Sequence, residues 1–448
     1  MEIGVKVTKK MTLKNYKNRQ WLLANRPQGM VTKDDFQWLE TEVENPEENE
    51  FLVKNLYLSF DPAQRGWMED RESYVPPVRI GEVMRAGSIA QVVESNNPDF
   101  KTGDIVQGTF GWQDFAISNG KGIMNATHVP ADIPITAPLS VFGITGLTAY
   151  FGLLDIGKPI EGNTVLISGA AGATGSIAGQ IAKLKGCRVI GTAGGAKKCR
   201  WLTEKANFDV AIDYKTADLD STLQEICPEG IDVIFDNVGG EFLNTALSKI
   251  NQNARIVICG AISGYNEKVP PPGPSNYTSL IIQRAKMEGF IVLDYVDQFN
   301  DAMKDLTSWV KEGKIVYQED IAEGLENAPE TLLRLYSGEN TGKIFRVQVG
   351  TPEMMDAGLD QAEANYWSKN VGPYIKSNSA GRTVMWGRSA EASVVPESSS
   401  NNDLRMVMFY NYKDSGEQDF WRFRERQAKA RAAMDEQLDS AMNVMVCS

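Results

Sequence analysis

The chain has 448 residues, 42% of them hydrophobic and 23% charged, a composition typical of a globular protein with two or three domains. The formal net charge of −12 argues against nucleic acid as the main partner, because phosphate binding needs a basic surface. The five cysteines form no CxxC pair, and no run approaches the roughly 20 apolar residues that span a bilayer.

The first 130 residues alternate short apolar runs with turn signals. The segment MEIGVKVTKK at the start has no apolar stretch of the signal-peptide kind, so we expect a cytoplasmic protein without a membrane partner. Runs at 51–58 and 89–93 lie between turns such as Asn45-Pro46 and Pro76-Pro77. Several short strands at this spacing are typical of a barrel-like, mostly antiparallel domain.

From about residue 135 the pattern changes to strands alternating with helices. A strand at 164–168 leads through a glycine-rich turn into a helix at 176–186, and a second strand follows at 187–193. Further apolar runs lie at 211–214, 231–237 and 255–261. The alternation predicts a doubly wound parallel sheet of Rossmann type. A helix at 301–313 and a strand at 342–349 complete this part.

Residues 351–448 have a pattern of their own. Helices are predicted at 352–377 and 420–442, and strands at 381–395, 404–413 and 443–446. This order resembles a small α+β ferredoxin-like domain without its first strand, as found in dimeric α/β barrels. One interpretation is a dimerisation or stability unit. The other is a second ligand site or a lid, with candidate aromatic residues Tyr366, Trp367, Trp386, Tyr410 and Trp421.

The strongest motif is the glycine-rich turn GAAGATG at 169–175. It follows a predicted strand and opens a predicted helix, the context in which such a turn binds a dinucleotide. The glycines let the backbone approach a pyrophosphate, and the helix N-terminus offers free N–H groups to that anion. The alternative is a turn that only packs the strand against the helix.

The residues after the next strand favour NADPH over NADH. An NAD site would place Asp or Glu there, but the chain has no carboxylate before Glu204. Instead Lys197, Lys198 and Arg200 are available to pair with a 2′-phosphate, Lys198 foremost. The alternative is a solvated basic start to a helix.

The sequence predicts no metal site. A catalytic zinc needs three protein ligands, yet the first 186 residues hold no cysteine, and the only histidine, His128, is interpreted as a surface residue. Without a Lewis acid, hydride addition is easier at the far carbon of an enone. The charge then develops on the enolate oxygen, where a tyrosine or the cofactor ribose can donate a hydrogen bond.

Eight segments together resemble one family. They are LYLSFDPAQRGWM (56–68), VPPVRIGEVMRAGSIAQVVES (75–95), GITGLTAYFGLLDIG (143–157), SGAAGATGSIAGQIAKLKGCRVIG (168–191), FDNVGGE (235–241), CGAISGYN (259–266), PPGP (271–274) and GENTGKIF (338–345). They are similar to the zinc-independent medium-chain dehydrogenases/reductases of the prostaglandin reductase and leukotriene B4 12-hydroxydehydrogenase group, which includes curcumin and 2-alkenal reductases.

The resemblance implies a homodimeric enzyme that reduces the double bond of 2-alkenals or 2-alkenones with NADPH. It implies a GroES-like β-rich domain at 1–134 and 316–350 and a Rossmann domain at 135–315, with 351–448 as an extension. The cleft would lie between the first two domains.

The resemblance also assigns cofactor-binding residues by motif position. Beside Gly169 and Gly172, these are Ala173, Thr174, Gly175 and Ser176 at the pyrophosphate, Lys198 and Tyr214 at the 2′-phosphate, Asn237 at the nicotinamide ribose, Cys259, Gly260, Ala261, Ile262 and Tyr265 along the cofactor, and Phe290, Ile291, Val292 and Asn340 around the nicotinamide. Tyr265 is the candidate catalytic residue, with packing against the cofactor as its alternative role.

One position departs from the family pattern. Relatives usually have DPYMRG where this chain has Asp61-Pro62-Ala63-Gln64-Arg65-Gly66, so Ala63 removes an aromatic ring from the expected substrate wall. Asp61 and Arg65 are interpreted as turn and salt-bridge residues. Two other functions remain open at this point, an NADPH quinone reductase and a non-catalytic NADPH-binding scaffold.

Overall fold

The computed structural model describes residues 17–269 and 271–347. Contacts divide the chain into one unit of residues 1–349 and another of residues 350–448. The α+β domain that the sequence predicts at 351–448, with its candidate aromatic residues, lies outside the described residues. The first unit is a mixed α/β structure with two large sheets, one parallel and one mixed.

The parallel sheet has six strands in the order β10-β9-β8-β11-β12-β13. These are β8 (Thr164–Ile167), β9 (Arg188–Ala193), β10 (Val210–Asp213), β11 (Ile231–Asp236), β12 (Ile250–Ile258) and β13 (Lys286–Gly289). The strand order reverses between β8 and β11, the place where open α/β sheets bind their ligands. The parallel sheet expected from the alternating pattern is confirmed.

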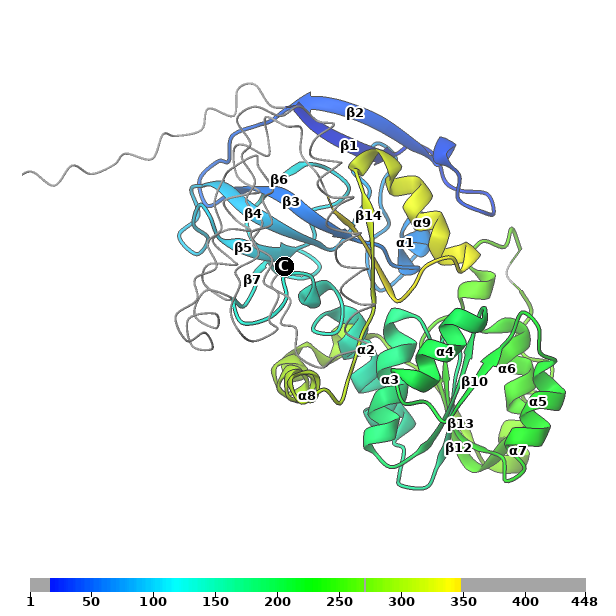
Figure 1. Cartoon of the computed structure of the whole chain (residues 1–448). Helices are drawn as coiled ribbons and strands as arrows, with labels where there is room; N and C mark the ends of the chain where they lie inside the picture. The colour runs from blue at the N-terminus through cyan, green and yellow to red at the C-terminus, as the bar shows by residue number, and fades with distance from the viewer. Residues whose placement is uncertain (1–16, 270, 348–448) are drawn as a thin grey trace, which may run out of the picture. The chain divides into compact units, whose positions relative to one another are not determined.

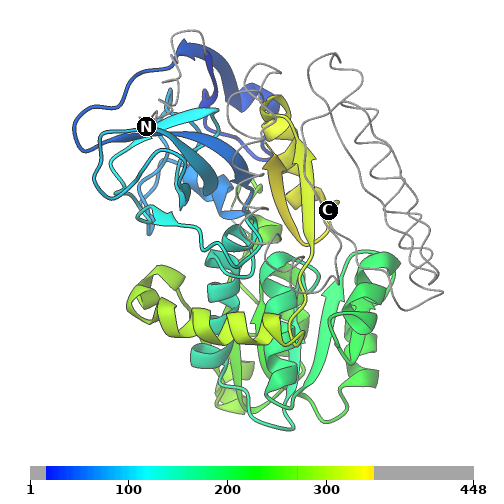
Figure 2. The same cartoon turned by 60° about the vertical axis from the view of Figure 1, so that its left-hand side comes forward.

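Helices cover both faces of this sheet (Figures 1 and 2). They are α2 (Ile144–Phe151), which a π-helical turn (Gly152–Gly157) continues, α3 (Ala173–Leu184), α4 (Ala196–Glu204), α5 (Leu219–Ile226), α6 (Gly240–Leu247), α7 (Ser279–Gln283) and α8 (Phe299–Lys311). Because both faces are covered, the central strands are largely apolar, and Leu166, Ile167 and Phe235 are fully buried. The helix expected at 176–186 begins three residues earlier, at Ala173.

The mixed sheet has seven strands, with β14-β15-β3-β4-β5-β7 in order and β6 on β3. These are β3 (Phe51–Ser59), β4 (Ser88–Ser95), β5 (Ile105–Gly108), β6 (Phe115–Ser118), β7 (Thr127–His128), β14 (Glu319–Glu323) and β15 (Lys343–Val347). Only β14 and β15 pair in parallel, so the described sheet is mostly antiparallel, as expected. The short helices α1 (Ala63–Trp67) and α9 (Ala328–Ser337) accompany it.

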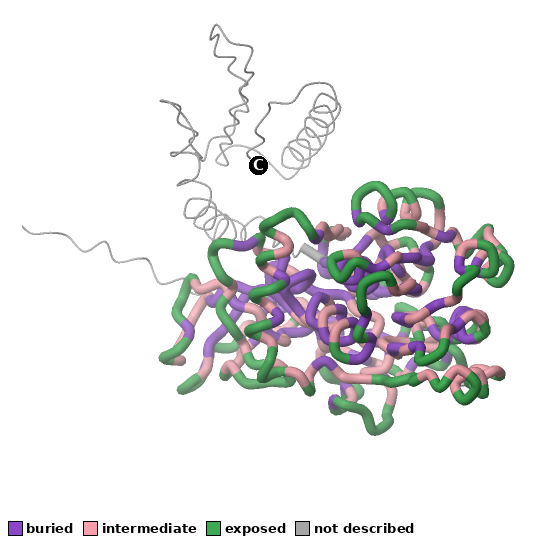
Figure 3. Tube along the Cα trace, turned by 90° about the horizontal axis from the view of Figure 1, so that it is seen from below, coloured by how far each residue is buried: buried purple, intermediate pink, exposed green. Residues whose placement is uncertain are grey.

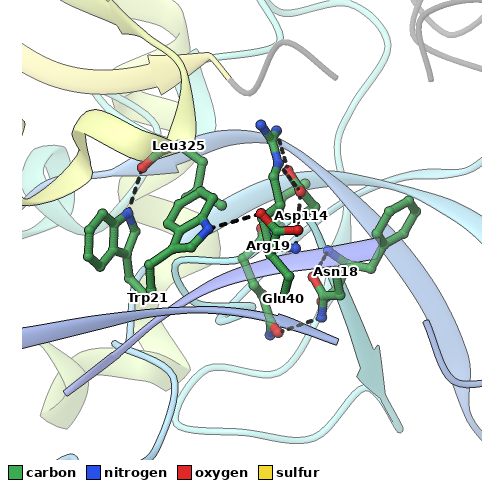
Figure 4. A network of polar contacts seen from close by, with 10 residues as sticks. Asn18, Arg19, Trp21, Glu40, Asp114 and Leu325 are labelled. Atoms are coloured by element: carbon green, nitrogen blue, oxygen red, sulfur yellow. Dashed lines mark hydrogen bonds and ion pairs between the residues drawn. The ribbon is translucent and has the colours of Figure 1, made fainter. Parts of the chain in front are cut away.

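A two-stranded ribbon, β1 (Lys17–Leu23) and β2 (Phe36–Glu42), lies against the mixed sheet. Figure 4 shows how polar contacts fasten it. The Arg19 guanidinium donates to both oxygens of the buried Asp114 carboxylate, at 2.6 and 3.0 Å. The Trp21 indole donates to the carbonyl oxygen of Leu325 at 2.8 Å. The ribbon therefore joins the start of the described chain to a segment some 300 residues later.

We call the part that carries β8–β13 the parallel-sheet lobe, and the part with the ribbon and the mixed sheet the mixed-sheet lobe. Buried segments run through the interior of both lobes, and exposed loops surround them (Figure 3). No helix within residues 17–269 and 271–347 is long and apolar enough to cross a membrane.

Candidate active site

A cleft of about 880 Å³ is lined by residues of both lobes. Its volume is near the upper end of the range for ligand pockets, roughly 300–1,000 Å³. The parallel-sheet lobe contributes the glycine-rich turn, and the mixed-sheet lobe contributes the segment that contains Ala63. Direct contacts join the lobes beside the cleft, such as the hydrogen bond of 3.2 Å from Arg65 Nε to Asn266 Oδ1.

The glycine-rich turn connects β8 to α3 and lines the cleft. Gly169 has a φ of +56°, a conformation that favours glycine, and Gly172 caps the N-terminus of α3. A Cβ atom on Gly175 would lie 2.6 Å from the carbonyl oxygen of Gly169, so a side chain there would open the turn. The tight turn and the N–H groups at the start of this 12-residue helix fit a pyrophosphate.

Asp236, at the end of β11, fixes the neighbouring loop. Its fully buried carboxylate accepts hydrogen bonds from Ser168 Oγ at 2.7 Å and from the main-chain N–H groups of Val238 and Gly239 at 2.9 and 3.1 Å. Burial raises the pKa of Asp236, and these bonds oppose the rise. Ser168 also accepts from the main chain of Asn237 at 2.7 Å, so the expected nicotinamide-ribose residue is held by this network.

Lys198 and Tyr214 line the cleft beyond the end of β9. The Lys198 ammonium donates to the carbonyl oxygen of Gly338 at 2.7 Å, and burial, followed by the charge of Lys215, lowers its pKa. The nearby Asp213 accepts from the main-chain N–H groups of Gly195 and Lys215, at 2.8 and 3.1 Å. Two lysines and a phenol thus gather where the sequence predicts the 2′-phosphate, an arrangement that fits a dianion.

Tyr265 follows the short turn of residues 262–264 and lines the cleft. Its phenol oxygen accepts a hydrogen bond of 3.2 Å from the main-chain N–H of Ala261. Burial raises the pKa of Tyr265, so the phenol keeps its proton at neutral pH. In the described part of the chain the O–H has no acceptor, which leaves it available to donate to a bound molecule.

Asp61 and Arg65 make structural contacts, in line with the interpretation from sequence. Asp61 pairs with the buried Lys343 ammonium and accepts from Ser59 Oγ at 2.6 Å. The Arg65 guanidinium pairs with Glu69 at 3.0 Å. Asp61 also lines the cleft, beside Ala63.

Of the residues assigned to the cofactor by motif position, all but two line this cleft, whereas the further basic candidates Lys197 and Arg200 do not. Ser176 is buried in the first turn of α3, and Ala261 is exposed and contacts Tyr265 through its main chain. His128, which does not line the cleft, is exposed and pairs with Asp104 at 3.0 Å. No group of three or more metal-binding side chains occurs among the described residues.

Sequence reasoning missed several cleft residues of the mixed-sheet lobe. They are Trp67, Tyr74, Arg85, Tyr336 and Lys343. The Tyr336 hydroxyl donates to the carbonyl oxygen of Pro62 at 3.3 Å, and burial raises the pKa of this phenol. These positions are far apart in the chain and carry no shared motif, so only the fold brings them together.

Comparison with known proteins identifies the family. A model described as the N-terminal domain of oxidoreductase matches residues 19–126, and one described as zinc-binding dehydrogenase matches residues 173–309. The NADPH-dependent curcumin reductase of Escherichia coli is 45% identical over 333 residues, which cover 73% of this chain and 96% of that protein. The chain belongs to the medium-chain dehydrogenase/reductase family.

Other medium-chain reductases of the same group are nearly as similar. Prostaglandin reductase 1 of Bos taurus is 44% identical over 329 residues, covering 72% of this chain and 97% of that protein. The crystal structure of CurA from Vibrio vulnificus in complex with NADPH has a TM-score of 0.70 and 42% identity, over 74% of this chain and 99% of that one. The family resemblance drawn from the eight segments is confirmed.

Proposed function

We propose that this protein reduces the conjugated carbon–carbon double bond of enals or enones, with NADPH as its cofactor and without zinc. The observation that carries the proposal is that one cleft contains the glycine-rich turn, Lys198 and the phenol of Tyr265. The names of the relatives support it, since one is an NADPH-dependent curcumin reductase and another a prostaglandin reductase.

The residues of the cleft can be assigned to parts of the cofactor. The turn at 169–175 and the start of α3 would hold the pyrophosphate, while Lys198 and Tyr214 would neutralise the 2′-phosphate. Asn237, Cys259 and Phe290 would enclose the nicotinamide end, together with Gly260, Ile262, Ile291, Val292 and Asn340. When bound, NADPH supplies the hydride that reduces the double bond.

Tyr265 supplies the chain's own contribution to the chemistry. As the double bond is reduced, negative charge develops on the carbonyl oxygen of the substrate. The phenol can donate its proton in a hydrogen bond to that oxygen, while the N–H of Ala261 holds the phenol oxygen in place. One such donor contributes about 10²- to 10³-fold to the rate. Because this hydrogen bond stabilises the charge on the substrate oxygen, the reaction needs no metal ion as a Lewis acid, and we therefore propose that it is zinc-independent.

A substrate panel tests the proposal. Purified protein should oxidise NADPH when 3-nonen-2-one or 4-hydroxynonenal is added. The product of each should be the saturated ketone or aldehyde, with its carbonyl group intact. Faster turnover of menadione than of either enone would favour a quinone reductase. Tight NADPH binding with no turnover across the panel would contradict the proposal and favour a scaffold function.

We also propose that the protein is a cytoplasmic homodimer. The supporting feature is the edge strand β13, whose residues are all exposed. Exposed apolar side chains accompany it, including Ile281 (73% exposed), Ile282 (68%) and Met287 (38%). A second copy of the chain would cover this edge and these side chains. The extension at 351–448, proposed as an α+β domain in addition to the GroES-like and Rossmann domains, would aid this association.

A further inference from the structure

The segment of residues 338–342, between α9 and β15, contacts the parallel-sheet lobe at both of its ends. At its start, the carbonyl oxygen of Gly338 accepts the hydrogen bond of 2.7 Å from the Lys198 ammonium. At its end, Gly342 pairs with Gly172 of the glycine-rich turn in an isolated β-bridge. Gly342 has a φ of +68°, and a Cβ atom there would lie 2.2 Å from a main-chain carbonyl oxygen, so only glycine fits. The segment therefore links the cation proposed for the 2′-phosphate to the turn proposed for the pyrophosphate.

An ion pair outside the cleft anchors this segment. The carboxylate of Asp320, on β14, accepts hydrogen bonds at Oδ2 from the main-chain N–H of Thr341 at 3.0 Å and from Arg334 Nη2 at 2.6 Å. Arg334 belongs to the last turn of α9. The side chains are 16% exposed for Asp320 and 31% exposed for Arg334, so salt screens the pair less than it screens a surface pair. Neither residue lines the cleft.

The charge of Asp320 also acts on Lys198. Burial and the charge of Lys215 lower the pKa of Lys198, and the charge of Asp320 opposes this fall. The carboxylate is therefore within electrostatic range of the ammonium assigned to the 2′-phosphate. Without a partner of its own, a carboxylate at this range would compete with the phosphate for the ammonium and would also repel the phosphate. Arg334 opposes both effects, because it neutralises the carboxylate.

We propose that Arg334 is a positioning residue for NADPH: it neutralises Asp320 and so leaves the Lys198 ammonium free to pair with the 2′-phosphate. Without the charge of Arg334, the ammonium would turn from Gly338 toward the unpaired carboxylate. NADH has no 2′-phosphate, so its binding should not depend on the ion pair. This inference rests on the cofactor site of the proposed function and adds a determinant of cofactor preference that does not touch the cofactor.

Fluorescence titration with NADPH and with NADH tests the proposal. Arg334→Gln removes the charge and keeps a hydrogen-bond donor. It should weaken NADPH binding by about tenfold and change NADH binding by less than about twofold. Arg334→Lys keeps the charge and should retain most of the NADPH affinity. The matched control is Lys33→Gln, which breaks the ion pair with Glu330 in the first turn of the same helix, away from the cleft, and should leave both affinities unchanged.

A second substitution separates this role from structural damage. Adding Asp320→Asn to Arg334→Gln removes the unpaired charge and keeps an acceptor for the Thr341 N–H, so the NADPH affinity should return to within about threefold of wild type. A double variant as weak as Arg334→Gln overturns the proposal. Unchanged NADPH affinity in Arg334→Gln, or equal weakening for NADPH and NADH, overturns it as well. Should Arg334→Gln not fold, Arg334→Met is measured against the same criteria.

Because the measurement is binding, it separates this inference from the reductase chemistry. NADPH binding that depends on Arg334 in a protein that reduces no enone would sink only the reductase. Enone reduction by an Arg334→Gln variant whose NADPH affinity equals that of wild type would sink only the role of Arg334. Failure of wild-type protein to bind NADPH would overturn both.

Discussion

The ammonium of Lys198 lies 2.7 Å from the carbonyl oxygen of Gly338, so the first turn of α4 is tied to the residue that caps the C-terminus of α9. Lys198 belongs to the parallel-sheet lobe and Gly338 to the segment before β15 of the mixed-sheet lobe. The position of the charge proposed to recognise the cofactor thus depends on both lobes.

We predict that Lys198→Ala weakens NADPH binding by about 10- to 100-fold, because a charge-assisted hydrogen bond is worth about 1.5–3 kcal/mol. NADH binding should change little, since NADH has no 2′-phosphate. Fluorescence titration with each cofactor checks this. Lys205→Ala is the control, since Lys205 is exposed at the far end of α4 and does not line the cleft. Equal weakening for both cofactors would assign Lys198 a structural role.

Tyr265→Phe should lower kcat/KM for an enone by about 100- to 1,000-fold, because it removes one hydrogen-bond donor to the developing charge. The NADPH affinity should stay within about twofold of wild type. Tyr336→Phe offers a matched control in the same cleft, since its hydroxyl is already engaged with Pro62. Unchanged kcat/KM in Tyr265→Phe would leave only a packing role.

The pH dependence of the same reaction gives an independent check. Burial raises the pKa of Tyr265 above its ordinary value near 10, so the phenol should remain a donor through about pH 9. Between pH 7 and about pH 9, kcat/KM of the wild-type protein should therefore decline no more steeply than kcat/KM of Tyr265→Phe. A decline centred near neutral pH that vanishes in the Phe variant would contradict the assignment.

Asp236→Asn should lower the free energy of unfolding by about 1–3 kcal/mol, the penalty for leaving buried donors without an acceptor. The amide would turn an NH₂ group toward N–H donors that the carboxylate now satisfies. Urea denaturation measures the change. Ser168→Ala should be milder, because it removes one donor to Asp236 and the acceptor of the Asn237 N–H but leaves the two main-chain bonds of Asp236. A variant as stable as wild type would show that the loop does not depend on this carboxylate.

Ile281→Lys together with Ile282→Lys should convert a dimer to single chains, because two charges would have to be buried at the β13 edge. Light scattering measures the mass. Ile160→Lys is the control, since Ile160 is comparably exposed (68%) and belongs to the loop before β8 rather than to α7 or β13. A protein that stays dimeric with both lysines would place the interface elsewhere. Removal of residues 351–448 then tests how far the extension contributes.

The parallel sheet could be predicted because its signals are local. The runs around Leu166, Ile190 and Phe235 are largely apolar, as is typical of strands buried on both faces, and helical patterns separate them. The glycine-rich turn lies within seven consecutive residues, so its place between β8 and α3 could also be predicted from the sequence. The limits of α3 shifted by only a few residues, which reflects the weak sequence signal at helix ends.

The other wall of the cleft could not be predicted, because it depends on contacts between distant segments. Arg85, Tyr336 and Lys343 come from three separate segments of the chain and line one cleft only after the protein folds. The ribbon was missed for a related reason, since Trp21 is anchored by Leu325, far along the chain. The burial of Asp236 near the glycine-rich turn could not be predicted either, because it follows from the pairing of β11 with β8.

Titration of the purified protein with NADPH and with NADH, side by side, tests the central claim most directly. The turn at 169–175 with Lys198 predicts saturable binding of NADPH at a Kd at least about tenfold below that for NADH. Failure of NADPH to bind, or equal affinity for the two dinucleotides, would contradict the account.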